Sequence, residues 1–303
     1  MKKLLLIPLL LTLVLASCTK TKTYDIVATL FPQYDISKEI IGDKELSVHM
    51  LLRPGQDGHA FEPTSKEMIQ IKKSKIFFYT SLEMEPWVKK ITPKDGVFVD
   101  LSHVLHESHS SHNHEHDHDH EHDDNLHYWT VIDNLKMMTE EILENIVKID
   151  KNNEAYYRNN ATILIDKLES IKQSFMNIDG RDTLELYYIG HNVFSLFSHE
   201  VGIHIQSLTD AYTSDANPTS AQIKDMIEKI KSSNAHILYY DLLEGFRLES
   251  SIKSDLLQQN YEITLLPLHS LHNISKSQKD DGVTLIDLLN ENLDNIKRSF
   301  IKE

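Results

Sequence analysis

Two runs of alternating strand and helix patterns, separated by one long helical pattern, most limit how this chain can fold. Short apolar strands that alternate with amphipathic helices are typical of βαβ units and a largely parallel sheet. The long pattern covers residues 154–176 and would extend roughly 35 Å at 1.5 Å per residue. Its apolar positions recur every three or four residues, on one helical face: Leu164, Leu168, Ile171 and Phe175. We therefore predict an α/β fold with two lobes, each a mainly parallel sheet flanked by helices, joined by one long rigid backbone helix.

The same patterns define the predicted elements and domains. In the first run we expect strands over 23–30, 46–52, 76–79 and 97–101, and helices over 35–41, 64–73, 85–91 and 131–149. In the second run we expect strands over 184–189, 203–208, 236–240 and 263–266, and helices over 191–201, 220–232, 248–258 and 285–300. The predicted domains are an N-terminal lobe (24–149), a linking helix (150–178) and a C-terminal lobe (179–303).

The N-terminus carries the pattern of an exported protein. Two lysines precede an apolar run at residues 4–15, which is short for a bilayer span and fits the h-region of a signal peptide. The run ends in Leu-Ala-Ser-Cys at residues 15–18, which resembles a bacterial lipobox. An ordinary signal peptide with an incidental cysteine is the alternative, but Cys18 is the only cysteine and has no disulfide partner. We expect a signal peptide over 1–17, a lipid on Cys18 and a tether over 18–23, which would hold the protein to a membrane outside the cytoplasm.

The composition is acidic and rich in histidine. The formal net charge is −15, and eighteen of the 303 residues are histidine. Binding to nucleic acid needs clustered Lys and Arg to neutralise phosphates, so we expect no partner of that class. A cation is the kind of partner that this composition suits.

Residues 103–124 form an acidic, low-complexity segment with nine histidines and seven acidic residues. We predict a solvated loop, because almost nothing in this segment can be buried. One interpretation is a charged tract with no specific role. The other is a flexible and weak metal collector, since closing a flexible loop on an ion costs conformational entropy. The histidines of this accessory metal loop are His109, His112, His114, His116, His118, His120 and His122.

Four further histidines lie where a strand or a loop gives way to the next element: His59, His127, His191 and His269. Two come from each half of the chain. Ligands of parallel sheets bind beyond the carboxyl ends of the strands, so these side chains could converge in a metal cleft between the lobes. Four neutral imidazoles suit tetrahedral Zn²⁺. Each of them alone is more often a structural or surface histidine, and it is their joint placement that favours a metal site.

The chain resembles the zinc- and manganese-binding solute receptors of bacterial ABC importers over essentially its whole mature length. The Gly-x-Asp-x-His-x-x-Glu-Pro run around His59 is similar to the first-ligand motif of that family. The histidine-rich segment precedes His127, as it precedes the second ligand in zinc members. The His-x-x-Phe pattern at His191 and the Pro-Leu-His-Ser-Leu run around His269 are similar to the regions of the third and fourth ligands. The resemblance implies an extracytoplasmic receptor that delivers zinc to an ABC permease with its ATPase, and we expect a monomer.

The fourth ligand is the position at which the chain departs from the family pattern. Manganese-type members have an aspartate immediately before the matching proline, where this chain has Leu266. Other zinc members have a glutamate two residues after the proline, where this chain has His269. His269 is therefore the expected fourth ligand, and His272 is the alternative. Imidazole suits zinc, whereas harder metals prefer oxygen ligands, so Zn²⁺ is favoured over Mn²⁺.

Three functions compete at this stage. A receptor needs no catalytic residue, and because the chain has no Walker A sequence, the ATPase would be a separate protein. A zinc-dependent hydrolase would need an open coordination position and a general base beside it. A metal-buffering or adhesion lipoprotein would use mainly the histidine-rich segment. Four protein ligands would fill the coordination sphere, so we predict a receptor and not an enzyme.

Overall fold

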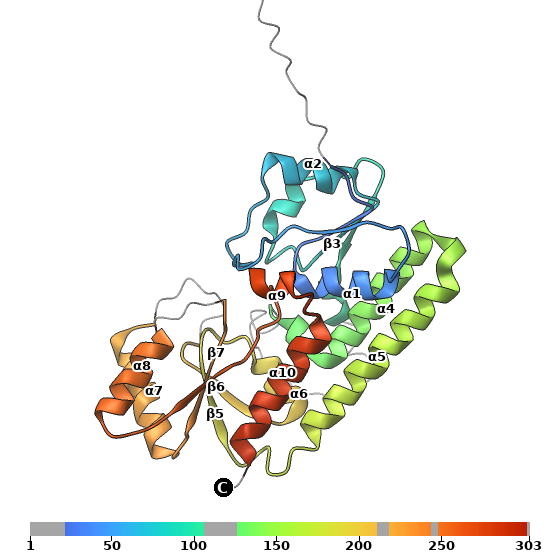
Figure 1. Ribbon diagram of the computed structural model, residues 1–303. Coiled ribbons are helices and arrows are strands. Elements are labelled where there is room, and N and C mark those ends of the chain that lie inside the picture. The colour runs from blue at the N-terminus through green and yellow to red at the C-terminus, as the bar shows by residue number, and fades with distance from the viewer. Residues whose placement is uncertain (1–21, 106–125, 211–217, 244–247, 302–303) are drawn as a thin grey trace, which may run out of the picture.

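The computed structural model describes residues 22–105, 126–210, 218–243 and 248–301 of the chain. These residues form two α/β lobes, one above the other in Figure 1, with the long helix α5 (Glu154–Met176) running along one side. Each lobe contains one sheet of four parallel strands with helices against it. The predicted fold class is therefore confirmed.

The first sheet has the strand order β2-β1-β3-β4, and every pair is parallel. Its strands are β1 (Ile26–Ala28), β2 (Val48–Met50), β3 (Ile76–Tyr79) and β4 (Val97–Asp100). All residues of β1 and β3 are buried, because these two strands lie in the middle of the sheet and helices cover it. In Figure 1, α2 lies above this sheet and α1 and α4 lie below it.

The second sheet repeats this topology, with the parallel order β6-β5-β7-β8. Its strands are β5 (Glu185–Ile189), β6 (His204–Ser207), β7 (Ile237–Tyr240) and β8 (Thr264–Pro267). Successive side chains of a strand point to opposite faces. Tyr187 accordingly packs into the cluster formed with α7 and α8, whereas Tyr188 packs into the larger core that includes α5 and α10.

The helices of the first half start and stop at recognisable signals. They are α1 (Phe31–Ile41), α2 (Ser65–Lys73), η1 (Pro86–Lys90), η2 (Leu101–His103), η4 (Tyr128–Thr130) and α4 (Ile132–Ile149), where η marks a 3₁₀ helix. The Thr64 side chain caps α2 by accepting a hydrogen bond from Glu67 N. Gly42 ends α1 with a φ of 58°, and a Cβ there would lie 2.5 Å from the Tyr156 hydroxyl oxygen. Glycine thus suits both the backbone and the space at this position.

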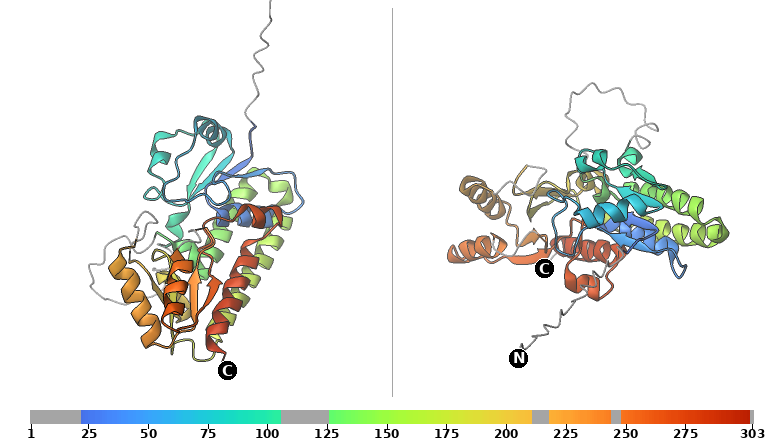
Figure 2. Two further views of the ribbon diagram at one scale, coloured as in Figure 1. Left: turned by 60° about the vertical axis from the view of Figure 1, so that its left-hand side comes forward. Right: turned by 90° about the horizontal axis from the view of Figure 1, so that it is seen from above.

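The second half contains five α-helices and one short 3₁₀ helix among the described residues. They are α6 (Ser195–Val201), α7 (Ser220–Ser232), α8 (Leu248–Gln258), α9 (Lys276–Asp280), α10 (Leu285–Lys297) and η6 (Arg298–Phe300). Helices α7 and α8 lie on one face, and α6 and α10 lie on the opposite side, toward α5 (Figures 1 and 2). Thr219 caps α7 by accepting from Gln222 N, as its sequence predicts.

The predicted long helix is confirmed with the expected bounds, 154–176, and it follows the short turn η5 (Lys151–Asn153). It packs against α4 and α1 of the first half and against α10 of the second. Its buried positions form one stripe that joins a continuous hydrophobic core shared by both halves: Tyr157, Ala161, Leu164, Leu168, Ile171 and Phe175. A continuous core of this kind restrains the position of one lobe relative to the other.

Some elements differ in extent from the prediction. The helix expected over 191–201 begins only at Ser195, because the chain first makes a tight turn in which Val193 N donates to His191 O at 2.8 Å. The strand expected over 46–52 is shorter, since β1 offers it only three residues to pair with. The segment 85–91 forms a 3₁₀ helix and not an α-helix. Helix α9 has five residues, too few to produce a periodic sequence pattern, and the sequence does not predict it.

The segment after β8 returns to the first half of the molecule. Phe31 N donates to His272 O at 3.0 Å, and Gly55 N donates to Ile274 O at 2.9 Å. A little further on, Leu285 N donates to the carboxylate of Asp35 at 2.7 Å. These bonds join positions more than two hundred residues apart and make a second connection between the halves, beside α5.

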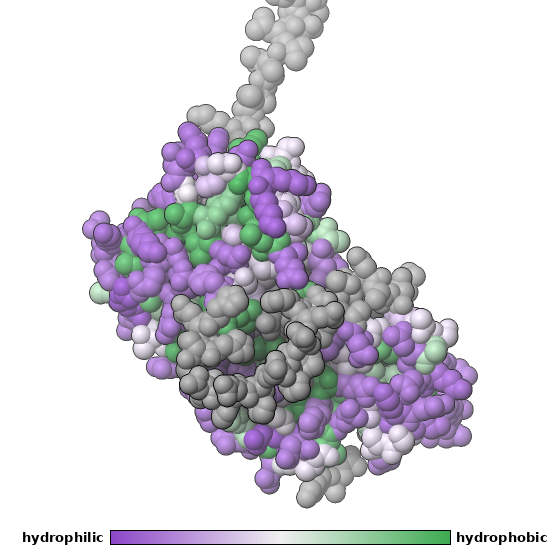
Figure 3. Space-filling view, turned by 180° about the vertical axis from the view of Figure 1, so that it is seen from behind, coloured by the Kyte–Doolittle hydropathy of each residue, from purple (hydrophilic) through white to green (hydrophobic). Residues whose placement is uncertain are grey.

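The surface is mostly hydrophilic on the face shown in Figure 3. An area on the upper lobe is more hydrophobic than its surroundings. The large hydrophobic side chains that are exposed lie on separate elements, for example Val97 on β4 and Leu257 on α8. None of the helices in the described part of the chain combines the length and the hydropathy that crossing a bilayer requires.

Candidate metal centre

His59 lies in the loop after β2, and Asp57 fixes its orientation. The Asp57 carboxylate accepts a hydrogen bond from His59 N at 2.9 Å, and the same oxygen lies 2.9 Å from His59 Nδ1. When Nδ1 donates its proton to this carboxylate, the Nε2 atom keeps its lone pair for a metal. The side chain of His59 is largely buried, with 8% of it exposed.

His127 immediately precedes η4 and is buried. Its ring meets the ring of Trp129 edge to face, with the ring centroids 5.2 Å apart. The indole Nε1 of Trp129 in turn donates to Ser270 O, in the segment that follows β8, at 3.0 Å. The position of His127 therefore depends on a contact between the two halves of the chain.

His191 comes two residues after the end of β5, at the carboxyl edge of the second sheet, and it is buried. This is the position at which parallel sheets commonly bind their ligands. The tight turn between His191 and Val193 lets the chain leave the strand before α6 begins. His191 thus belongs to the connection and not to the helix.

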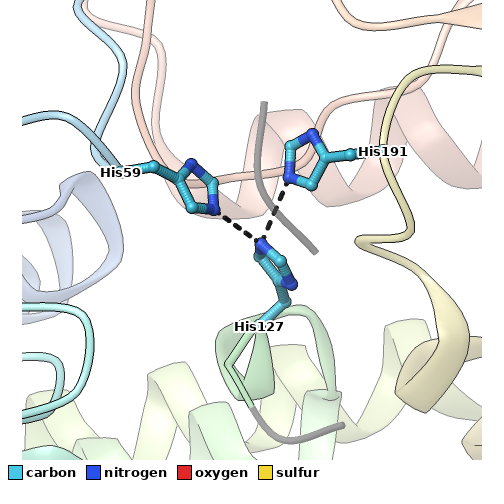
Figure 4. Close-up of side chains that lie close together, drawn as sticks. All are labelled: His59, His127 and His191. Atoms are coloured by element: carbon cyan, nitrogen blue, oxygen red, sulfur yellow. Dashed lines mark hydrogen bonds between the residues drawn. The ribbon is translucent and has the colours of Figure 1, made fainter. Parts of the chain in front are cut away.

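These three histidines converge on one point, although they come from three separate segments (Figure 4). The Nε2 atom of His127 lies 3.0 Å from Nε2 of His59 and 3.2 Å from Nε2 of His191. Tetrahedral zinc with Zn–N bonds of roughly 2.05 Å places its ligand nitrogens roughly 3.3 Å apart. Among the described residues, one group of His, Cys, Asp or Glu side chains brings its ligand atoms within 4.8 Å of one another, and it comprises His59, His127 and His191.

The electrostatics of the site favour a neutral imidazole at His127. Burial lowers the pKa of His127 to about 2, and the neighbouring rings of His191, His59 and His272 act in the same direction. The protonated, positively charged imidazole is therefore disfavoured at His127 at neutral pH. A histidine binds a metal as the neutral imidazole, so His127 is in the protonation state that metal binding requires.

His269, the expected fourth ligand, lies outside the triad group. Its Nε2 atom is 2.9 Å from a carboxylate oxygen of Glu291 on α10. Its backbone is also tied to that helix, because His269 N donates to Asn292 Oδ1 at 2.7 Å and Asn292 Nδ2 donates back to His269 O at 2.9 Å. The hydrogen bond with His269 lowers the pKa of Glu291.

His272, the alternative, is also outside the group of converging ligand atoms, but it interacts electrostatically with all three rings of the triad. It is buried, and burial lowers its pKa, with further lowering from the nearby rings of His59 and His191. Its Nδ1 atom is 2.6 Å from the hydroxyl oxygen of Ser270. The backbone N of Ser270 donates to the buried carboxylate of Asp241 at 2.8 Å. The ring of His272 is thus held at one nitrogen, with Nε2 as its remaining coordinating atom.

Sequence reasoning missed the residues that orient the histidines. Asp57 stands two residues before His59 within the motif, which was a usable signal. Trp129 and Ser270 are joined by a hydrogen bond although they lie 141 residues apart in the sequence, and no local pattern reveals that contact. The lipidation position Cys18 and the seven histidines of the accessory loop lie outside the described residues.

Comparisons with known proteins identify the family of the chain. The family model described as ZnuA, zinc-uptake complex component A, periplasmic, matches residues 26–299. The high-affinity zinc uptake system protein ZnuA of Bacillus subtilis (strain 168) is 28% identical over 285 residues, which cover 91% of this chain and 87% of that protein.

Two further similarities concern a longer relative and a solved structure. The zinc-binding lipoprotein AdcA of Streptococcus pneumoniae (strain R6) is 25% identical over 324 residues, covering 100% of this chain but only 62% of AdcA. The crystal structure of the metal-dependent lipoprotein YcdH from Bacillus subtilis has a TM-score of 0.71 and 23% identity, covering 92% of this chain and 100% of that one. That likeness shows the same fold. With two parallel-sheet lobes, a triad of histidines between them and a family match from residue 26 to residue 299, the chain belongs to the ZnuA family of zinc-uptake complex components.

Proposed function

We propose that this protein captures Zn²⁺ between its lobes and delivers it to an ABC permease whose ATPase is a separate protein. The observation that carries the proposal is the convergence of the Nε2 atoms of His59, His127 and His191, at 3.0 and 3.2 Å, in one buried place. Three imidazole nitrogens at this spacing match the ligands that zinc prefers. The names of the relatives that bind or take up zinc support the choice of cargo.

We propose that His272 supplies the fourth ligand in preference to His269. His269 faces Glu291 at 2.9 Å, and releasing it would break that hydrogen bond. His272 already lies close enough to His59 and His191 for their rings to lower its pKa. Ser270 holds Nδ1 of His272, which leaves Nε2 as the ligand atom.

Zinc suits this set of donors better than manganese. The group of converging ligands contains imidazoles and no carboxylate among the described residues. Manganese prefers oxygen donors, whereas imidazole suits zinc, copper and nickel. The chain also lacks the aspartate before Pro267 and has Leu266 there.

The proposed location is the outer face of a membrane, with a lipid on Cys18 and a short tether over 18–23. The apolar run and the Leu-Ala-Ser-Cys sequence support this proposal, as do the relatives named lipoproteins. We propose that the protein acts there as a monomer and that the histidine-rich segment 103–124 collects metal as an accessory to the triad.

A receptor fits the site better than the hydrolase considered above. A hydrolase would need an open coordination position and a free general base. The carboxylate next to the triad, Asp57, already contacts both N and Nδ1 of His59. If His272 closes the fourth position, no site for an activated water remains.

Metal analysis combined with a competition titration tests the proposal. The chain from Thr19 onward is purified, stripped of metal and titrated with Zn²⁺ and Mn²⁺ against chromophoric chelators. We expect one tight zinc site per chain, with manganese bound far more weakly. Equal affinity for the two metals, or no tight site at all, would overturn the proposal. Hydrolysis of model esters, phosphates or peptides by the zinc-loaded protein would favour the enzyme instead.

A further inference from the structure

Helix α4, which starts just after His127 and η4, begins without a cap of its own. Its N-cap residue is Val131, whose side chain makes no capping hydrogen bond. The first N–H groups of a helix have no partner within the helix, and burying them without one costs free energy. The sequence around Val131 therefore leaves this helix end to be capped from elsewhere.

Glu200 on α6 supplies that cap from 68 residues away. Its Oε2 atom accepts a hydrogen bond from Ile132 N at 2.7 Å, and its Oε1 atom accepts one from Asp133 N at 2.8 Å. The side chain of Glu200 is only 7% exposed, and Lys172 of α5 lies 3.5 Å from Oε1. A carboxylate at the start of a helix also interacts favourably with the helix dipole.

This bond joins the two segments that carry neighbouring histidines of the triad. His127 lies five residues before Ile132, and His191 lies nine residues before Glu200. A second bond runs alongside, because the hydroxyl of Thr130 lies 3.3 Å from Val193 O and 2.9 Å from His127 O. The two segments are thus clamped at both Glu200 and Thr130, and their histidines end 3.2 Å apart.

We infer that Glu200 is a positioning residue for metal capture, which holds His127 and His191 at ligand spacing before the metal arrives; this rests on the zinc-capture function proposed above. Two ligands already in place lose little conformational freedom when they bind an ion, which favours tight binding. Without Glu200 the amides of Ile132 and Asp133 lose their acceptor and the start of α4 can loosen. Zinc binding would then have to order the segment as well.

A purely structural role for Glu200 makes a different prediction. If Glu200 only stabilised the fold, its substitution would destabilise the zinc-free and the zinc-bound states equally. The protein would then lose stability, but its zinc Kd would not change. A positioning role raises the Kd, because only the zinc-free state relaxes. Zinc affinity and the order of the zinc-free helix end therefore separate the two roles.

The test uses the full mature chain, residues 18–303, in detergent, with Glu200→Ala and Glu200→Gln. Glu169→Gln is the matched control, because it removes a carboxylate that pairs with Lys136 on α4 but touches no amide at the helix start. The zinc Kd is measured by chelator competition. Amide hydrogen exchange of Ile132 and Asp133 is measured with and without zinc.

We expect Glu200→Ala to raise the zinc Kd about 10- to 100-fold, the usual effect of losing a residue that orients a ligand. Glu200→Gln should raise it less, since one carbonyl oxygen can still accept one of the two bonds. In both variants the two amides should exchange faster than in the wild type without zinc, and zinc should restore their protection. The control should match the wild type.

An unchanged Kd in Glu200→Ala, or unchanged exchange at both amides, would overturn the inference while leaving the proposed function intact. A failure of the proposed function looks different, because the wild type and Glu169→Gln would then bind no zinc tightly either.

Discussion

The loops that follow β2 and β8 both bring histidine to the site, and they do so differently. The loop after β2 contributes one histidine, His59, which is oriented by a carboxylate only two residues away. The loop after β8 contains two histidines within four residues, and they have different surroundings. His269 contacts Glu291 of α10, whereas His272 contacts Ser270 and interacts electrostatically with the rings of the triad.

The backbone between these two histidines accounts for the difference. Leu271 has a φ of 68°, in the left-handed region that residues with side chains seldom adopt, and it is buried. The chain therefore changes direction between His269 and His272. The comparison teaches that the partners and the backbone of a histidine after a strand decide its surroundings, and that position along the chain is not sufficient.

Removing the histidine at the centre of the triad should have the largest effect. His127 lies within 3.2 Å of both other nitrogens, so His127→Ala should weaken zinc binding on the order of 1,000-fold. Chelator competition measures the change. His236→Ala is the control, because His236 is exposed and stacks on Tyr261 outside the site. Tight binding retained in His127→Ala would remove the triad from the proposal.

The two histidines after β8 provide the sharpest test of the comparison. His272→Ala should raise the zinc Kd about 100-fold, because a ligand is lost from a closed coordination sphere. His269→Ala should change it less than about threefold, since the partner of His269 is a half-exposed carboxylate outside the triad. Both are measured by the same competition assay. The reverse ranking would restore His269 as the fourth ligand.

In the loop after β2, the substitution Asp57→Asn should weaken zinc binding about tenfold. The amide can still accept from His59 N, but it lacks the charge that favours a proton on Nδ1. Asp100→Asn is a matched control, because Asp100 also accepts from the backbone N two residues later, at 2.9 Å, but does so away from the triad. Equal zinc affinity in Asp57→Asn and the wild type would show that the loop alone orients His59.

The pH dependence of the free energy of unfolding should show whether His272 is buried as the neutral imidazole. Its pKa is lowered in the folded state, so below about pH 6.5 the unfolded chain binds a proton that the folded chain does not. The zinc-free protein should therefore lose stability as the pH falls from 7 to 5, by up to about 1.4 kcal/mol per pH unit for this group. Urea unfolding of the wild type and of His272→Asn measures the slopes. Identical slopes would contradict the burial of a neutral His272.

Deleting residues 109–123 should have the smallest effect on the tight site. The triad is oriented by Asp57, Trp129 and Glu200, all outside the deleted segment. We expect a change in the tight Kd of less than about twofold and the loss of weaker zinc sites, as measured by calorimetry. Loss of the tight site together with the segment would favour the metal-buffering lipoprotein over the receptor.

The sequence predicts those parts of the molecule that depend on local patterns. The spacing of Leu164, Leu168, Ile171 and Phe175 predicts α5 with its observed bounds, because helical periodicity is a property of neighbouring residues. The alternation of strands and helices predicts two parallel sheets. The motif around His59, and the positions of His127 and His191 at element boundaries, indicate three of the residues that converge.

The tertiary structure decides how those residues are held and which partners each histidine after β8 meets. Glu200 caps a helix that begins 68 residues before it, and Trp129 bonds to Ser270 over 141 residues. The turn at Leu271 exists within a segment that is bonded to Phe31 and Gly55 of the other half. Such contacts depend on the packing of distant segments, and the order of residues along one segment carries no record of them. The sequence by itself thus determined two α/β lobes and their candidate histidines, and only the folded chain decided which of them meet.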